Sequence, residues 1–447
     1  MRLAWFSPFP PARTGIAGRS AELVRNLRAR GFGVDIFVHR VAPDSPELAS
    51  AHDFVWRQAR EAYDLAVYQF GNSSHHDYIW PYALRYPGLV VLHDVRLHHA
   101  RAAALLRERR GGDYRAELAF DQPGIDPDLA ELAVAGFDSA LYNNWPMVRS
   151  LVESARLVAT HGEGAACEVA DRFPQARVRS IRLGEGIEMT AEREAAARDK
   201  VRARYGIGEE TVVFGCFGAL TPDKRLIPIL DAMVEIAPYA PDARLILGGA
   251  AMPHFDVHAE IQRRHLEARV IVTGYLETDD ELTEHLVACD VSLNLRWPTA
   301  RETSGPWLRA LAAGRPTIVI DLVHMGDVPS IDPRTWKPLA ARSSDPICIA
   351  IDILDENHSL ALAMSKLARD GPLRAQLGRT AREWWRQTHS VDAMVDDYVQ
   401  LIGDAAALAP PVVELPEHLR ADGARALRAL AAPLGLGAVL SREGLLE

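Results

Sequence analysis

The feature that most constrains the fold is a unit of strand, loop and helix that occurs twice in the chain. The first copy has an apolar strand at residues 3–7, a loop rich in Gly and Pro at 8–18, and then an amphipathic helix. The second copy has a strand at residues 212–218, the loop at 219–225, and another amphipathic helix. This order is how a βαβ layout begins. The sequence therefore predicts two lobes, each starting its own sheet.

Further apolar runs bounded by turn residues follow each copy, as expected for strands buried on both faces of a parallel sheet. They cover residues 34–38, 65–70, 89–94, 156–160 and 178–183, and then residues 244–249, 269–274, 290–295 and 316–321. A chain of 447 residues also exceeds the roughly 250 to 300 residues at which one core stops growing. The predicted fold class is α/β, with two Rossmann-like, doubly wound parallel-sheet lobes.

The boundary between the lobes is expected in the charged, helix-prone stretch at residues 192–206. After about residue 372 the apolar pattern is helical only, and the last forty residues are rich in Ala, Leu, Pro and Arg. The predicted organisation is a first domain at 1–190, a second at 191–372, terminal helices at 373–404, and an appendix at 405–447.

Charge and cysteine usage exclude several classes of protein. The formal net charge of -10 argues against general nucleic-acid binding, which needs a surplus of Lys and Arg. The four cysteines lie far apart without a CxxC pair, and we find neither a secretory segment nor a run of about 20 apolar residues. We expect a cytoplasmic protein whose contact with a membrane, if any, is peripheral.

One stretch could make such a contact. Between residues 101 and 115, Ala and Leu alternate with arginines, namely Arg101, Arg107, Arg109, Arg110 and Arg115. This stretch could lie on an anionic lipid surface at the inner membrane face or hold an anionic acceptor. A solvated helix face fits equally well.

Candidate ligand-binding residues follow the strands, because ligands of open parallel sheets bind beyond the carboxyl ends of the strands. In the first half, Gly15, Ile16 and Ala17 come just before a helix, whose free N–H groups and positive end attract an anion. A plain tight turn is the alternative. After the fourth strand come His93 and Asp94, where a histidine could donate to or accept from a ligand. A structural histidine and, with the nearby histidines, a metal site are the alternatives.

In the second half, Lys224 and Arg225 follow a strand and could neutralise the charge of a leaving phosphate. A solvated basic turn is the alternative. Further on, Arg296 and Glu302 precede a run of Thr303, Ser304 and Gly305 at the start of a helix that ends at Gly314. The hydroxyl and N–H groups of this run would cap the helix and face a diphosphate. The Glu302 carboxylate could accept hydrogen bonds from sugar hydroxyls, or simply stabilise the positive helix end.

Six segments in this order give the chain a family resemblance; they are residues 10–20, 90–99, 217–225, 272–282, 288–305 and 311–319. Over about residues 1–403 the chain resembles retaining glycosyltransferase family 4, the glycosyl transferases group 1 of GT-B fold. The resemblance implies two lobes facing across a cleft, the first binding the acceptor and the second the nucleotide sugar. It also implies terminal helices that cross back to the first lobe.

Carried onto matching positions, the resemblance implies catalytic roles for His93, Lys224 and Glu302. The donor-binding residues it implies are Gly15, Ile16, Ala17, Arg225, Gly249, Arg296, Thr303, Ser304, Gly305 and Arg309. The acceptor-side residues are Asn72, His75, Asp94 and His98. No metal and no other cofactor are expected.

Two positions depart from the family pattern. Ala219 stands where a basic residue usually precedes the lysine. The second glutamate of the E-x7-E motif has no counterpart, since Ala310 has the formal spacing and Arg309 aligns only if the helix starts one residue earlier.

The predicted function is that of a retaining, metal-independent, hexosyltransferase-type glycosyltransferase (EC 2.4) in glycan biosynthesis. It would move sugar from a nucleoside-diphosphate sugar to a glycan, lipid-linked or small-molecule acceptor. The alternatives are an epimerase or phosphorylase of the same shape, and a non-catalytic protein that binds a nucleotide sugar or a glycan.

Overall fold

The computed structural model of the chain describes residues 1–41, 45–136, 141–252, 255–299, 303–322, 328–339, 345–420 and 430–442. The chain divides into two compact units. The first unit comprises residues 1–159, 169–179 and 401–447, and the second comprises residues 160–168 and 180–400.

The described residues of the first unit build most of a seven-stranded sheet with the order β3-β2-β1-β4-β5-β6-β7. Its strands are β1 (Arg2–Phe6), β2 (Gly33–Val38), β3 (Leu48–Ser50), β4 (Leu65–Phe70), β5 (Leu89–Leu92), β6 (Leu157–His161) and β7 (Val178–Ile181). β1 pairs in parallel with β2 on one side and β4 on the other. The strand order therefore reverses between β1 and β4, where doubly wound sheets bind their ligands.

Apolar side chains on both faces of β1 explain its central position, because parallel strands are covered by helices on both sides. The Phe6 ring packs on Phe37 of β2 and on Phe54, with ring centroids 5.1 and 5.0 Å apart. Helix α1 (Gly15–Ala29) follows β1 and starts at Thr14, whose hydroxyl accepts a hydrogen bond from the Ala17 N–H at 3.0 Å. This cap fixes where the loop ends and the helix begins.

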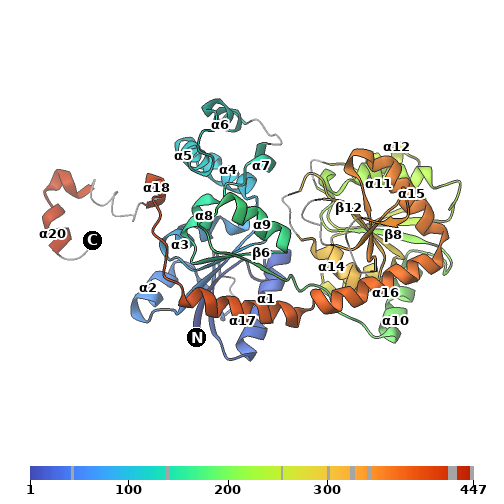
Figure 1. The fold of residues 1–447 in the computed structure, drawn as a ribbon, viewed down its shortest axis with the longest axis horizontal. Coiled ribbons are helices and arrows are strands. Elements are labelled where there is room, and N and C mark those ends of the chain that lie inside the picture. Colours follow the sequence, from blue (N-terminus) through green and yellow to red (C-terminus); the bar gives the residue numbers. More distant parts are fainter. Residues whose placement is uncertain are drawn as a thin grey trace. The chain divides into compact units, whose positions relative to one another are not determined.

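The other helices of the first unit include a small layer of their own above the sheet (Figure 1). Its members are α4 (His98–Arg107), α5 (Gly111–Asp121), α6 (Pro127–Val134), α7 (Leu141–Asn144) and α8 (Arg149–Ser154), packed around Tyr114 and Leu118. The remaining ones are α2 (Asp53–Arg60), η1 (Ser74–Ile79), α3 (Trp80–Arg85), α18 (Glu417–Arg420), η5 (Ala432–Leu434) and α20 (Gly437–Arg442). α9 (Glu163–Arg172) and α17 (Val391–Ala407) each have residues in both units.

In the second unit, the described residues form an eight-stranded sheet with the order β10-β9-β8-β11-β12-β15-β13-β14. The strands are β8 (Val213–Phe217), β9 (Arg244–Gly248), β10 (Val270–Gly274), β11 (Val291–Asn294), β12 (Thr317–Ile320), β13 (Ser330–Asp332), β14 (Lys337–Pro338) and β15 (Cys348–Ile351). The order reverses between β8 and β11, and the pair of β13 with β14 is antiparallel.

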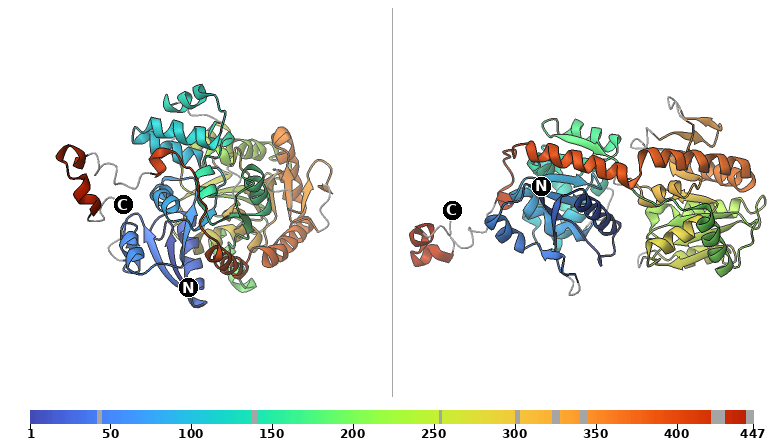
Figure 2. Two further views of the ribbon diagram at one scale, coloured as in Figure 1. Left: turned by 60° about the vertical axis from the view of Figure 1, so that its left-hand side comes forward. Right: turned by 90° about the horizontal axis from the view of Figure 1, so that it is seen from below.

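Helices lie on both faces of each sheet (Figures 1 and 2). In the second unit, α11 (Leu226–Glu235), α12 (Val257–Arg263) and α15 (Glu356–Arg369) pack together, with η2 (Pro222–Lys224) and η4 (Ile353–Asp355) at their ends. A second group consists of α10 (Ala191–Arg204), α13 (Asp279–Ala288), α14 (Gly305–Ala312) and α16 (Gly371–Thr388). None of the helices in the described ranges is long and apolar enough to cross a bilayer.

The predicted fold class is confirmed: both sheets are doubly wound, and every predicted strand is present. The prediction missed β3, β13, β14 and β15. β3 and β14 are two or three residues long, too short for a repeating apolar pattern to be visible. The stretch predicted as a linker or a lead-in helix is the helix α10.

Candidate functional site

The start of α1 lies at the carboxyl end of β1, where the first sheet reverses its strand order. Gly15 and Gly18 are exposed, and a Cβ atom added to either would meet no other atom within 4 Å. The N–H groups of a first helical turn have no partner within the helix. Gly15, Ile16 and Ala17 therefore offer an open, positively polarised helix end that can receive an anion.

His93 follows β5, and its ring is held between two side chains. Its Nε2 lies 2.7 Å from Oε1 of Gln69, and its Nδ1 lies 3.4 Å from a guanidinium nitrogen of Arg19. An amide oxygen accepts and a guanidinium donates, so a ring proton on Nε2 fits both contacts. His93 is thus a half-buried imidazole near the switch point. Sequence reasoning missed both Gln69 and Arg19.

Asn72 and Asp94 join the loops that follow β4 and β5. The Asp94 carboxylate accepts from the Asn72 N–H at 2.6 Å, and the Asn72 side-chain oxygen accepts from the Ala100 N–H at 2.9 Å. Both were predicted on the acceptor side. The structure places them together at the carboxyl edge of the sheet and gives them a bracing role there.

The other histidines of this region separate into exposed and buried ones. His75 is exposed, as an acceptor contact would require. His76 is 2% exposed, with Nδ1 2.9 Å from the Gln69 carbonyl, and burial lowers its pKa to about 4. Gly71, beside it, has no room for a side chain, since a Cβ would lie 2.6 Å from Ile16 and 3.0 Å from His76.

The prediction for His98 requires correction. His98 is 1% exposed, and its two ring nitrogens lie 3.0 Å from the Trp145 carbonyl and 2.9 Å from the Tyr114 hydroxyl. Burial lowers its pKa to about 4. These contacts join α4 to α5, so His98 is a core residue of the helical layer and not an exposed acceptor contact.

The burial and the ion pairs of the arginines between residues 101 and 115 bear on the lipid-binding hypothesis. Arg101 is 7% exposed, lies over the Trp80 ring and binds Glu117 through two nitrogens. Three others pair with carboxylates: Arg107 with Asp77, Arg110 with Asp113, and Arg115 with Glu131. Most of these arginines are therefore paired with carboxylates of the same unit, which gives the lipid-binding hypothesis no support.

In the second unit, glycines end the three neighbouring strands β8, β9 and β10. Gly218, Gly249 and Gly274 have φ angles of 106°, 159° and 75°. A Cβ on Gly249 would lie 2.0 Å from the Gly218 carbonyl oxygen, so the first two loops touch through their backbones. At these three positions the carboxyl edge of the sheet carries no side chain, which lets a ligand approach the backbone.

Lys224 lies across this edge. Its Nζ would be 3.0 Å from a Cβ on Gly218, so its amine sits over the end of β8. The loop is tied to the one after β11, because Arg296 pairs with Asp223 at 3.2 Å and the Trp297 N–H donates to the Asp223 carbonyl at 2.7 Å. The structure therefore brings Lys224 and Arg296 into one loop cluster, and their phosphate-binding role stays a prediction.

Arg225, by contrast, forms an ion pair away from this edge of the sheet. It has a φ of 58°, and its guanidinium binds the buried Glu356 through two nitrogens, one at 2.8 Å. This ion pair joins the loop to α15. Arg225 therefore does not take the place of the basic residue absent at Ala219.

Helix α14 begins as predicted. The Ser304 hydroxyl accepts from the Trp307 N–H at 3.4 Å, and Gly305 is the first helical residue. The Thr303 hydroxyl donates to the His161 carbonyl at 3.2 Å, which fixes the approach to the helix. Glu302, the predicted sugar-binding carboxylate, lies outside the described residues.

Arg309, one turn into α14, forms a buried ion pair that the sequence did not reveal. Its guanidinium lies 2.6 Å from Glu185 and 3.0 Å from Asp279. Glu185 is 8% exposed and stands between Gly184 and Gly186 in the sequence. In the sequence, Glu185 can be recognised as an acid between two glycines, a pattern that suggests a special role. Nothing in the sequence connects it with α14.

In the described ranges of the chain, no three His, Cys, Asp or Glu side chains are grouped in a way that could hold a metal ion.

Comparison with protein families connects the second unit with one group. Residues 211–347 match the family model described as glycosyl transferases group 1. This range contains the glycine-lined edge, Lys224, Arg296 and α14. No curated protein sequence matches the chain.

Comparison with solved structures concerns the fold. The sucrose-phosphate synthase of Thermosynechococcus elongatus is 17% identical with a TM-score of 0.61, over 90% of this chain and 98% of that one. The Anabaena protein HepE, solved with UDP and glucose, has the same identity and TM-score, over 90% and 99%. The catalytic domain of starch synthase IV from Arabidopsis thaliana, bound to ADP and acarbose, is 12% identical with a TM-score of 0.60, over 91% and 99%. Residues 211–347 are therefore similar to the glycosyl transferases group 1 family, and the chain as a whole has the GT-B fold.

Proposed function

We propose that the protein transfers a glycosyl group from a nucleoside-diphosphate sugar to an acceptor hydroxyl, with retention at the anomeric carbon. The observation that carries the proposal is the position of Lys224 over the glycine-lined carboxyl edge of β8 and β9, within the range that matches glycosyl transferases group 1. A diphosphate needs close approach to backbone N–H groups and a nearby cation. This edge supplies both.

In this reaction the second unit binds the donor. Lys224 and Arg296 balance the charge of the departing diphosphate, and the N–H groups at Ser304 and Gly305 add the positive end of α14. Glu302 accepts hydrogen bonds from hydroxyls of the transferred sugar. HepE, solved with UDP and glucose, and starch synthase IV, solved with ADP, have the same fold and support a nucleotide-sugar donor for this chain.

The first unit is assigned to the transferred sugar and the acceptor. The Gly15 turn attracts negative charge, and His93 presents a ring to sugar hydroxyls. His75 is exposed and contributes to acceptor choice among glycan, lipid-linked and small-molecule acceptors. Catalysis consists mainly of positioning and electrostatic stabilisation of the leaving group. We propose that the leaving diphosphate helps to deprotonate the acceptor on the same face of the sugar, and that no metal ion takes part.

One observation favours a second candidate function. The position next to the formal second motif glutamate is Arg309, which is engaged with Glu185, so a ribose contact expected from the family pattern is replaced by an ion pair. A chain altered at this point could bind a nucleotide sugar without transferring it.

Both candidates are tested by one series of measurements. A thermal-shift panel of UDP-, GDP-, ADP- and TDP-sugars should give one base that stabilises the protein by about 2.7 kcal/mol at roughly 100 times Kd. Release of nucleoside diphosphate from that sugar then supports transfer. Stabilisation without release would identify a binding protein, and no stabilisation by any of the sugars would contradict the proposal.

A further inference from the structure

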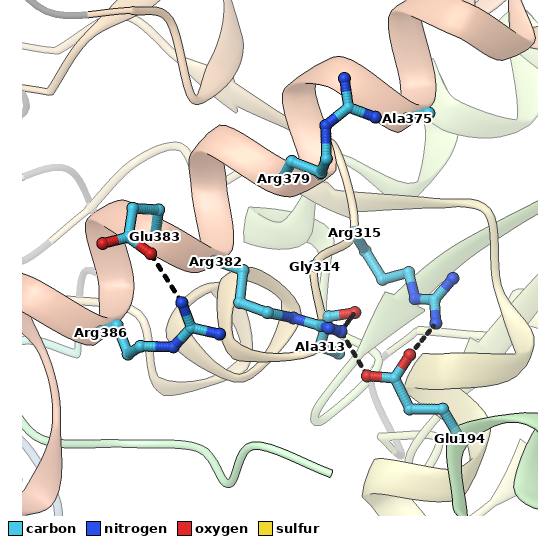
Figure 3. Close-up of a pocket in the computed structure, with 10 residues that line it drawn as sticks. Glu194, Ala313, Gly314, Arg315, Ala375, Arg379, Arg382, Glu383 and Arg386 are labelled. Atoms are coloured by element: carbon cyan, nitrogen blue, oxygen red, sulfur yellow. Dashed lines mark hydrogen bonds and ion pairs between the residues drawn. The ribbon is translucent and has the colours of Figure 1, made fainter. Parts of the chain in front are cut away.

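The second unit contains an open pocket whose lining includes none of the residues assigned to the donor. It has a volume of about 490 Å³ and lies where α16 packs on the turn after α14 and on α10 (Figure 3). Its lining side chains are unusually charged: Arg315, Arg379, Arg382 and Arg386 are arginines, and Glu194 and Glu383 are acids. The volume is within the usual range for small-molecule sites, roughly 300 to 1,000 Å³.

The floor of the pocket is a close contact between backbones. A Cβ on Gly378 of α16 would lie 2.1 Å from the Gly314 carbonyl oxygen, so no other residue fits at Gly378 without displacing the turn. Gly314 has a φ of 63°, and the Arg382 guanidinium lies directly on it. Arg382 also donates to the carbonyls of Ala312 and Ala313 at 3.1 and 2.8 Å, which caps the carboxyl end of α14. The arginines are thus held in place by the fold.

The positive charges in the pocket outnumber the negative ones. Glu194 is shared by Arg315, at 3.3 Å, and Arg382 (Figure 3). Arg386 pairs with Glu383 at 2.6 Å and also with Glu188, which is not part of the lining. With Glu188 counted, four guanidinium groups are matched by three carboxylates, a formal excess of one positive charge that the carbonyls at the end of α14 partly offset.

Two of the guanidiniums have donors to spare. The Nε of Arg315 is buried and has no hydrogen-bond partner among the described residues. Leaving a buried donor of a charged group without a partner is unfavourable. Burial also lowers the pKa of Arg315, which Glu194 only partly opposes. Arg379 is exposed and has no ion-pair partner in the described part of the chain.

We propose that this pocket is a second ligand site, which binds a phosphorylated small molecule. Guanidinium groups bind phosphate through paired N–H donors, and the charge of Arg379, unpaired among the described residues, favours an anion beside the other three arginines. The pocket is separate from the donor site because the two lie at opposite edges of the same parallel sheet. Arg315 precedes β12, whereas Lys224 follows β8. The proposal does not depend on the function proposed above.

The test is isothermal titration of the intact chain with inorganic phosphate, pyrophosphate and a hexose monophosphate at 0.15 M salt. Two variants on neighbouring positions of α16 provide a matched pair. Ala375→Glu adds a negative charge to the lining, and Gln376→Glu adds the same charge at an exposed residue outside it. We expect Ala375→Glu to weaken binding at least tenfold and Gln376→Glu less than twofold.

Two further variants separate this site from others. Arg379→Gln should weaken binding about tenfold, whereas Arg263→Gln, which removes an exposed arginine from α12, should not. Binding that is lost in Lys224→Ala and kept in Ala375→Glu would place the ligand at the donor site and would overturn the proposal. Absence of binding by the unmodified chain, or equal weakening in Ala375→Glu and Gln376→Glu, would overturn the proposal.

Discussion

Gly15 starts the helix that follows β1, and Gly249 follows β9. The two positions are glycines for different reasons. A side chain on Gly249 would collide with the Gly218 backbone, so the fold itself requires glycine there. At Gly15 a side chain would meet open space, and the helical backbone accepts alanine. The fold does not require glycine there, and a ligand that approaches the backbone closely would.

This contrast gives a prediction at the residue scale. Gly15→Ala should leave the free energy of unfolding unchanged or raise it by up to about 1 kcal/mol, because alanine favours the helix. It should lower sugar turnover at least tenfold. Gly403→Ala, in a helix where the added Cβ also meets open space, is the control for the helix effect. Equal turnover in Gly15→Ala and the unmodified chain would remove the Gly15 turn from the site.

The buried His76 makes stability depend on pH. Its pKa of about 4 lies below the ordinary value near 6.5, because burial disfavours the imidazolium. Between these two values the unfolded chain binds a proton that the folded chain does not, so the free energy of unfolding falls as pH drops below 6.5. From pH 6.5 to 5 the expected loss from His76 is about 2 kcal/mol.

Urea unfolding at pH 7 and pH 5 checks this. His76→Gln, which can still donate to the Gln69 carbonyl, should lose about 2 kcal/mol less than the unmodified chain on acidification. His258→Gln, on the exposed side of α12, should lose as much as the unmodified chain. The same loss in all three proteins would mean that His76 does not titrate as inferred.

At the scale of elements, α14 links the candidate site to the segment that joins the two sheets. Its first turn is capped by Ser304, and its middle is held by Arg309 to Glu185. Glu185 also accepts, through its carbonyl, from the Trp385 indole N–H at 2.7 Å. The joining segment is therefore fixed to both α14 and α16.

Removing the arginine should destabilise this arrangement. Arg309→Gln leaves the carboxylate of Glu185, 8% exposed, without its partner, and breaking a buried ion pair from one side costs roughly 3 kcal/mol or more. The matched control is Asp279→Asn, since Asp279 has a 70% exposed side chain and should cost less than about 1 kcal/mol. Differential scanning calorimetry of both variants tests this prediction. Equal melting temperatures for Arg309→Gln and Asp279→Asn would show that the buried ion pair does not hold the joining segment to α14.

At the scale of the whole molecule, the fold was accessible from sequence because parallel strands are continuous apolar runs. The strands at 3–7 and 212–218 show this pattern locally, and so does the α14 cap at Ser304. What sequence could not show depends on contacts between distant residues. His98 looked like a ligand-binding histidine because Trp145 and Tyr114, its partners, are 47 and 16 residues away. Arg101 looked like a free charge because Glu117 belongs to the next helix.

The central claim is that Lys224 stabilises the diphosphate leaving group of a nucleotide sugar. The most direct test is the rate of nucleoside-diphosphate release from the sugar selected by thermal shift, for the unmodified chain, Lys224→Ala and Lys200→Ala. Lys200, exposed on α10 and paired with Glu284, controls for loss of a lysine. The account predicts that Lys224→Ala lowers the rate at least tenfold, about 1.4 kcal/mol, with an unchanged melting temperature, and that Lys200→Ala does not. A rate in Lys224→Ala within a few-fold of the unmodified chain would contradict the account.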